Sequence, residues 1–85
     1  MAYRSSIKMT PIGELIRIEF LKQERSVAWF ARKLACDRTN IYRIFEKQSI
    51  DTEQLKRISI ILNHNFLADI ADDVDIKLSV KNQQQ

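Results

Sequence analysis

The sequence predicts an all-α protein built from four to five short helices. Its 85 residues include only one Gly and one Pro, too few for the many tight turns of a β architecture. Apolar residues recur at spacings of three and four along most of the chain, as they do on one face of a helix. The composition, 45% hydrophobic and 29% charged, is typical of a globular protein. At this length we expect one compact domain with a single small core.

The first two helices are predicted from capping residues and apolar spacing. Thr10 can cap a helix that has Pro11 at its first position, where the missing N–H costs nothing. Ser26 can cap a second helix of about two turns. The residues expected to face the core are Ile12, Leu15, Ile16 and Phe20 in the first helix, and Val27, Phe30, Ala31 and Leu34 in the second.

A third helix is expected after an abrupt break at Ala35-Cys36. Asp37 is placed to accept from the first free backbone N–H groups of this helix, which should run to about Glu46. Its inward residues are Ile41, Ile44 and Phe45. The outward face must then carry Arg38, Thr39, Tyr42, Arg43 and Glu46.

The remainder predicts two more helices and a tail. Asp51 can cap a fourth helix, with Gln54 as its capping pair and with Leu55, Ile58, Ile61 and Leu62 facing inward. A fifth, short helix begins near Phe66. The alternating stretch "DIKLSV" suits a short strand, and "KNQQQ" suggests disorder. The expected organisation is a flexible arm (1–9), a helical domain (10–75) and an extended C-terminal tail (76–85).

Charge is unevenly distributed along the chain. Residues 1–47 hold ten Lys or Arg and five acids, a net of +5, whereas residues 48–85 hold four bases and six acids, a net of −2. A basic half rich in Arg favours phosphate or nucleic acid as a partner. The alternative is that these charged residues form an ordinary surface in contact with water, which would give the same count of charges.

Two short helices joined by a tight turn form a helix-turn-helix unit, whose second helix can enter a major groove. The stretches "FARKLACDRTNIYRIFEK" and "LKRISIIL" resemble the λ-repressor-like helix-turn-helix family of phage repressors, Cro proteins and xenobiotic-response-element regulators. That family reads approximately "LAxxLGVSxSTISRIExG" followed by "LxxIAxxL". The resemblance covers residues 12–63, with the motif at 27–46. This sequence departs from the family at Ala35 and Lys47, where Gly is usual, and at Phe45, where Glu is common.

The resemblance implies that four residues of the third helix read base edges: Arg38, Thr39, Tyr42 and Arg43. Their chemistry is suitable, since Arg can bond guanine and Thr or Tyr can contact a thymine methyl or a phosphate. Arg43 is equally suited to a flanking phosphate or to an intrahelical pair with Glu46, and Asn40 to a capping role beside Asp37. The candidate DNA-backbone contacts are Ser26, Asn40, Arg32, Lys33 and Lys47.

Such regulators commonly bind DNA as two-fold dimers. The apolar residues Phe66, Leu67, Ile70 and Val74 are the candidate dimer surface, and packing of these residues over the protein's own core is the alternative. The expected function is a sequence-specific, double-stranded-DNA-binding transcriptional regulator of repressor type. The alternative is a non-catalytic protein-interaction module, resembling an antitoxin or adaptor, that uses Trp29 and the stripe from Phe66 to Val74.

Other functions find little support in the sequence. A single Cys and a single His give no cluster at metal-ligand spacing, and no catalytic group or Gly-rich phosphate loop is recognisable. No cofactor, small-molecule ligand or enzymatic activity is expected. No apolar run resembles a signal peptide or membrane span, so a cytoplasmic protein without membrane contact is expected.

Overall fold

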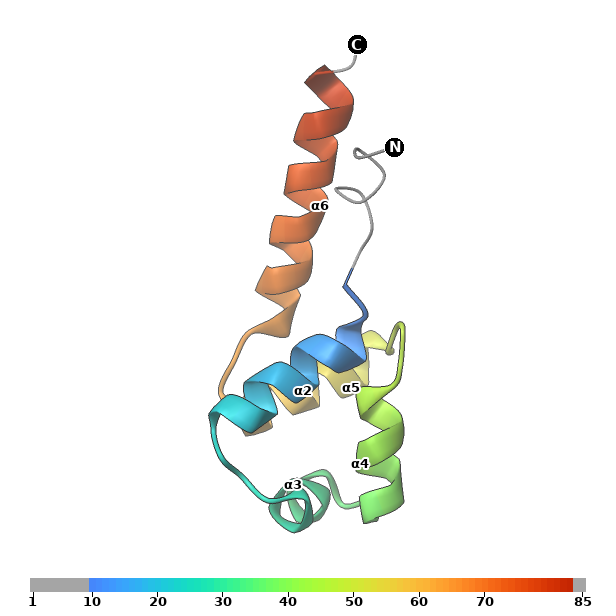
Figure 1. Cartoon of the computed structure of the whole chain (residues 1–85), viewed down its shortest axis with the longest axis vertical. Helices are drawn as coiled ribbons and strands as arrows, with labels where there is room; N and C mark the ends of the chain where they lie inside the picture. Colours follow the sequence, from blue (N-terminus) through green and yellow to red (C-terminus); the bar gives the residue numbers. More distant parts are fainter. Residues whose placement is uncertain (1–9, 84–85) are drawn as a thin grey trace.

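Five α-helices make up the computed structural model, which describes residues 10–83 (Figure 1). They are α2 (Ile12–Lys22), α3 (Val27–Leu34), α4 (Arg38–Phe45), α5 (Thr52–Leu62) and α6 (Phe66–Gln83). No strand occurs in this range, so the all-α prediction is confirmed. The predicted arm, residues 1–9, lies outside the described residues.

The core forms where α2, α3, α4 and α5 meet, and the beginning of α6 closes it. Phe66, the first residue of α6, is completely buried. The other buried apolar residues are those that the spacing predicted to face inward: Ile12, Ile16, Phe20, Phe30, Ala31, Leu34, Ile41, Ile44, Leu55, Ile58 and Leu62. Each of the large side chains among them stabilises the fold by about 1.5–3 kcal/mol if fully removed from water.

An aromatic cluster connects α2, α3 and α4 within this core. The rings of Phe20 and Phe30 are stacked with centroids 5.3 Å apart, and Phe45 lies 5.4 Å from Phe20. Trp29 is partly buried beside Phe30, with their centroids 6.4 Å apart. Phe45, the residue that departs from the family pattern, therefore anchors the end of α4 to the two preceding helices.

Three of the four predicted N-terminal caps form. The side-chain oxygens of Ser26, Asp37 and Asp51 accept the backbone N–H three residues on, at 2.8–3.0 Å. The prediction for Thr10 is wrong, because α2 begins at Ile12 with Pro11 as its N-cap and no side-chain cap. The N–H groups of Ile12 and Gly13 donate instead to the carbonyls of Gln48 and Lys47, so a long-range contact replaces the local cap.

The helix α6 corrects the prediction of a strand and extended tail after residue 75. Residues 76–83 continue the same helix, which rises from the globule as a single rod (Figure 1). No neighbouring strand is present in the described chain to pair with a strand here, and an unpaired strand has no stability of its own. The helix satisfies its backbone internally, and Lys77 donates to Asp73 one turn earlier at 2.6 Å.

Candidate nucleic-acid interface

The helix α4 buries one face and exposes the other. Its inward residues, Ile41 and Ile44, are buried. Its outward residues are all exposed: Arg38, Thr39, Asn40, Tyr42 and Arg43. The structure thus brings the four candidate base-reading residues together on the solvent side of one short helix.

The side chains on this outer face make few contacts with the rest of the described chain. Neither Arg38 nor Arg43 takes part in an ion pair among residues 10–83, and Arg43 does not pair with Glu46. The ring of Tyr42 is 55% exposed and lies edge-on to Phe45, with centroids 6.4 Å apart. The two guanidinium groups are therefore available to a partner, while Tyr42 is steadied by the aromatic cluster.

Close backbone contact fixes the position of α4 against α2. A Cβ added to Gly13 would lie 2.3 Å from the carbonyl oxygen of Ile44 and 2.6 Å from that of Phe45. Only a residue without a side chain allows this approach. The N–H of Gly13 also donates to the carbonyl of Lys47 at 2.9 Å. The beginning of α2 thus holds the end of α4, and its own N–H groups are satisfied there.

The turn between α3 and α4 has the left-handed geometry that its sequence disfavours. Ala35 adopts φ 56° and ψ 46° at the position where the family usually has Gly. The N–H of Cys36 donates to Ala31 at 3.0 Å and that of Ala35 to Arg32 at 3.2 Å, which is the Schellman arrangement at a helix end. The departure at Ala35 therefore leaves the turn intact at a conformational cost of about 1–2 kcal/mol.

Two further contacts support this turn. The Nη2 group of Arg57, on α5, donates to the carbonyl of Leu34 at 3.3 Å. Cys36 is half-buried against the core, and this burial raises the pKa of its thiol, as does the neighbouring Asp37 carboxylate. Cys36 therefore behaves as a small apolar residue at neutral pH.

The beginning of α3 carries a second polar site. Ser26 is exposed, and its hydroxyl oxygen accepts the backbone N–H of Trp29. The guanidinium of Arg25 lies over the Trp29 ring, 4.5 Å from its centroid. A cation over an indole face is favourable by about 0.5–1 kcal/mol at an exposed site. Arg25 directly precedes Ser26, the N-cap of α3, and the N-terminal end of a helix is where the helix dipole favours an anion.

The remaining candidate backbone contacts are exposed but spread over the surface. Arg32 and Lys33 lie in the last turn of α3, and Lys47 follows the C-terminal end of α4. The backbone N–H of Asn40 donates to Asp37, so the cap does not use its side-chain amide. The structure thus assigns Asn40 a capping role through its backbone and leaves its exposed side chain on the outer face of α4.

Charge separates along the molecule. Residues 26–47, which include α3 and α4, hold five bases and two acids, a net of +3, whereas residues 66–83 hold two bases and four acids, a net of −2. Figure 1 shows α6 rising away from the globule on the side opposite α3 and α4. The basic helices and the acidic helix therefore occupy opposite ends of the structure.

The candidate dimer surface is only partly exposed. Phe66 belongs to the core, and Ile70 is partly buried against it, so the inclusion of Phe66 in a dimer surface is wrong. For Phe66 and Ile70 the alternative prediction holds, because both pack over the protein's own core. Leu67 and Val74 are 36% and 40% exposed because they lie on a different side of α6.

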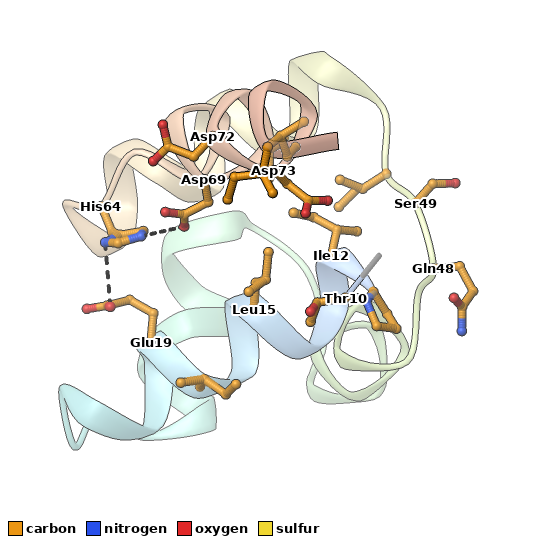
Figure 2. A pocket seen from close by; sticks show the side chains of 16 residues that line it. Thr10, Ile12, Leu15, Glu19, Gln48, Ser49, His64, Asp69, Asp72 and Asp73 are labelled. Carbon is orange, nitrogen blue, oxygen red and sulfur yellow. Dashed lines mark hydrogen bonds and ion pairs between the residues drawn. The ribbon is translucent and has the colours of Figure 1, made fainter. Parts of the chain in front are cut away.

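A groove of about 680 Å³ lies between α2 and α6 (Figure 2). Its apolar lining includes Ile12, Leu15 and Ile70. At one end His64 joins the two helices, with Nε2 2.8 Å from Asp69 Oδ2 and Nδ1 3.5 Å from Glu19 Oε1. His64 is therefore a bridge between helices, although its sequence context suggested an ordinary surface or capping residue.

Glu19 is the most strongly held carboxylate of this groove. The Gln23 amide donates to it at 2.9 Å and lowers the pKa of the Glu19 carboxyl; burial opposes this effect, and Lys22 and His64 reinforce it. The same Gln23 amide donates to the carbonyl of Leu62 at 2.6 Å. This cluster ties the end of α2 to the connection between α5 and α6.

Three supporting contacts of the site were not predicted from the sequence, those of Gly13, Arg25 and Arg57. The signal for Gly13 was its position as the one glycine of the sequence within a helical pattern, where a glycine often has a packing reason. The signal for the stacking of Arg25 was the Arg-to-Trp spacing of four residues, although the pair spans the start of a helix. No local signal pointed to the contact of Arg57 with Leu34, because 23 residues separate them.

Within residues 10–83 no cluster of three or more His, Cys, Asp or Glu side chains could hold a metal ion. None of the helices in that range combines the length and apolarity needed to cross a bilayer. Comparisons with protein-family models, curated proteins and solved structures found no match to this chain. The fold and site alone define a small all-α protein that presents one short, exposed, arginine-bearing helix.

Proposed function

We propose that the protein is a sequence-specific, double-stranded-DNA-binding transcriptional regulator that inserts α4 into the major groove. The observation that carries this proposal is the exposed outer face of α4, with Arg38, Thr39, Tyr42 and Arg43 side by side and neither arginine in an ion pair among the described residues. An α-helix with its side chains is about 10–12 Å across, which matches the width of about 12 Å of the major groove.

The early residues of α4 are the proposed readers of sequence. Arg38 can donate two parallel hydrogen bonds to the O6 and N7 atoms of guanine, worth about 1–3 kcal/mol of discrimination. Thr39 and Tyr42 offer a methyl group and a ring edge to thymine, together with hydroxyl groups for phosphate. Arg43, one turn after Thr39, reaches either a base or a flanking phosphate.

The proposed backbone contacts come from α3 and its surroundings. Arg25 is stacked on Trp29 and directly precedes the N-cap of α3, so we propose that its guanidinium and the helix N-terminus share one phosphate. Arg32 and Lys33 extend the positive surface from the other end of α3. Displacement of counterions from the phosphates would supply most of the affinity.

The protein-interaction module is less well supported by these contacts. Of the two apolar features assigned to it, the stripe from Phe66 to Val74 is only partly exposed, because Phe66 is buried and Ile70 is partly buried in the protein's own core. Trp29 is partly buried beside Phe30 and has Arg25 stacked on one face. Trp29 therefore does not offer the freely exposed apolar surface that such a module would use. Repression rather than activation is taken from the family resemblance alone.

The decisive experiment is selection of bound duplexes from a random pool, repeated at two salt concentrations with wild type, Arg38→Ala and Lys56→Ala. Wild type should enrich one sequence, and Arg38→Ala should lose preference for a G·C pair at one position, about 10- to 100-fold in relative affinity. Lys56→Ala is the matched control, because Lys56 is exposed on α5 beside Ile60 and Leu67, away from α4; it should behave like wild type.

The variant Lys33→Ala distinguishes the contribution of phosphate contacts from that of base reading. This change should weaken binding to all duplexes alike and reduce the slope of log affinity against log salt by about 1. A protein that ignores duplexes of every sequence at low salt would contradict the proposed function. Equal loss of preference in Arg38→Ala and Lys56→Ala would contradict the assignment of α4 as the reading helix.

A further inference from the structure

The exposed apolar residues of α6 lie in one line along the helix. Leu67, Ala71, Val74 and Leu78 follow one another at spacings of four, three and four residues, and all four are exposed. Such spacing forms the a and d positions of successive heptads, the seam along which two helices pair in a coiled coil. We call these four residues the stalk stripe.

The stalk stripe is separate from the face that α6 turns to its own core. Phe66 and Ile70, which pack on the core, lie about a quarter turn away around the helix. The four carboxylates of α6 all lie off the stripe, at Asp69, Asp72, Asp73 and Asp75. The stripe is therefore uncharged, and it lies beside the core-facing side of the helix, with Ile70 at its edge.

The apolar surface continues from α6 onto α5. Ile60 is 79% exposed, and it lines the same shallow hollow as Leu67. Leu78, at the other end of the stripe, is 51% exposed. A run of large apolar side chains from Ile60 to Leu78 is unusual for a surface that meets only water.

The helix α6 also extends well beyond the residues that hold it to the globule. Its core contacts are made by Phe66 and Ile70, in its first two turns, yet it runs on to Gln83. The turns after Ile70, residues 71–83, are about as long as an isolated helix that is only marginally stable in water, roughly 12–15 residues. Val74 and Leu78 are 40% and 51% exposed, so much of their apolar surface is left uncovered by the described residues.

We propose that the stalk stripe pairs with the stripe of a second copy of this chain, forming a parallel two-helix stalk. An uncharged stripe is self-complementary, because each residue meets its own equivalent across a two-fold axis without repulsion. Ala71, in the middle, allows the two helices to approach closely. In a parallel pair, Asp75 beside the seam of one helix lies opposite Ile70 of the other helix, so no two carboxylates face each other across the seam.

The parallel direction rests on the proposed function, whereas the pairing does not. The free end of α6 and the helix α4 lie at opposite ends of the structure (Figure 1). Parallel stalks would place both copies of α4 at the same end, as one duplex requires, and antiparallel stalks would place them far apart. The acidic stalk would then point away from the DNA phosphates.

Association through this surface is expected to be weak. Four stripe residues and Ile60 cover less than the roughly 800 Å² per partner of a standard interface, so we expect a dissociation constant in the micromolar range. Two binding sites about one helical turn apart on one duplex would raise the effective concentration and stabilise the pair.

Sedimentation equilibrium without DNA tests the pairing, so its outcome does not depend on whether the protein binds DNA. The variants are Leu78→Glu, Leu78→Ala and the matched control Ile76→Glu, since Ile76 is 59% exposed on the same helix but lines the groove on its other side. Wild type and Ile76→Glu should dimerise between about 10 and about 500 µM. Leu78→Glu should weaken association at least 10-fold and Leu78→Ala by a smaller factor, with helix content unchanged by circular dichroism.

Either of two results would overturn the pairing: a monomeric wild type up to about 500 µM, or equal weakening by Leu78→Glu and Ile76→Glu. The direction is tested by disulfide formation with oxidised glutathione in a Cys36→Ser background. Leu78→Cys should give linked dimers and Ile76→Cys should not. Linkage of Leu78→Cys to Leu67→Cys, in preference to itself, would overturn the parallel direction.

Discussion

At the scale of single residues, the chain ends three helices with left-handed residues that are not glycine. Glu24, Ala35 and Asn63 have φ values of 56°, 56° and 52°. Asn tolerates this conformation through its short polar side chain, whereas Ala gains nothing that offsets the clash of its Cβ. Ala35 is therefore a place where the turn of the motif stores strain, and the one glycine of the chain is used elsewhere, at Gly13.

Replacement of Ala35 by Gly should stabilise the protein. Relief of the left-handed strain is worth about 1–2 kcal/mol, and the greater freedom of Gly in the unfolded chain removes part of this gain, which leaves about 0.5–1 kcal/mol. The measurement is urea unfolding of wild type and Ala35→Gly. Asn63→Gly is the matched control and should change stability by a few tenths of a kcal/mol at most. A less stable Ala35→Gly would contradict the strain argument.

At the scale of elements, the contact between α2 and α4 decides where the reading helix sits. Gly13→Ala would drive a methyl group into the carbonyl oxygens of Ile44 and Phe45, and backbone cannot move aside as a flexible side chain can. We expect a loss of about 1–3 kcal/mol, as for other overpacked cores, measured by urea unfolding. The environment of Tyr42, read from the NMR signals of its ring protons, should change as α4 shifts.

A control for Gly13→Ala makes a similarly small change without crowding. Ser79→Ala alters an exposed position of α6 and should leave both the unfolding free energy and the Tyr42 signal unchanged. If Gly13→Ala were as stable as wild type, the close approach of α2 to α4 would not exist in solution, and another explanation would be needed for the position of α4.

The cluster around Glu19 makes the attachment of α6 sensitive to acid. The Gln23 amide lowers the pKa of Glu19 below its ordinary value of 4.5, so the folded state binds this proton less readily than the unfolded state. The resulting stabilisation is present above pH 4.5 and is lost as the pH falls through the lower folded value. Glu19→Gln should therefore be less stable than wild type at about pH 7, with the difference shrinking as the pH falls below 4.5.

Urea unfolding at neutral pH and at successively lower pH checks this prediction. Asp75→Asn serves as the control, because Asp75 is exposed on α6 and makes no ion pair within the described residues. Its difference from wild type should not follow the same pH dependence. A constant difference between wild type and Glu19→Gln from neutral to acid pH would contradict the role of the Glu19 carboxylate.

The elements that could be predicted from sequence are those set by local signals. Ser26, Asp37 and Asp51 act on the N–H three residues later, and the buried stripes of α2 to α5 follow directly from apolar spacing. The groups that position α4 could not be predicted, because Gly13 and Arg57 act across 31 and 23 residues on Ile44 and Leu34. The alternation of Ile76 and Leu78 with polar residues wrongly predicted a strand. An exposed helix with apolar residues on two sides can show the same alternation.

At the scale of the whole molecule, α6 and the globule have separate tasks. Among the residues whose burial the structure describes, the buried apolar ones lie between Ile12 and Phe66, and Ile70 is the last to pack against them. The part of α6 after Val74 therefore contributes little to the core and is free to serve another purpose. Its direction away from α3 and α4 suits a part that holds two copies together at a distance from DNA.

Truncation after Val74 tests this separation of tasks. The shortened chain keeps every core residue, so its unfolding free energy should fall by less than about 1 kcal/mol, because mostly exposed helix is removed. It loses Leu78, so its self-association should be weakened at least as much as by Leu78→Glu. On DNA it should bind a single half-site with unchanged affinity and lose the cooperative binding of two half-sites, which titration of both duplexes would measure. If truncation lowered the free energy of unfolding by several kcal/mol, the outer turns of α6 would support the globule. If the truncated chain still bound two half-sites cooperatively, the dimer contact would lie elsewhere.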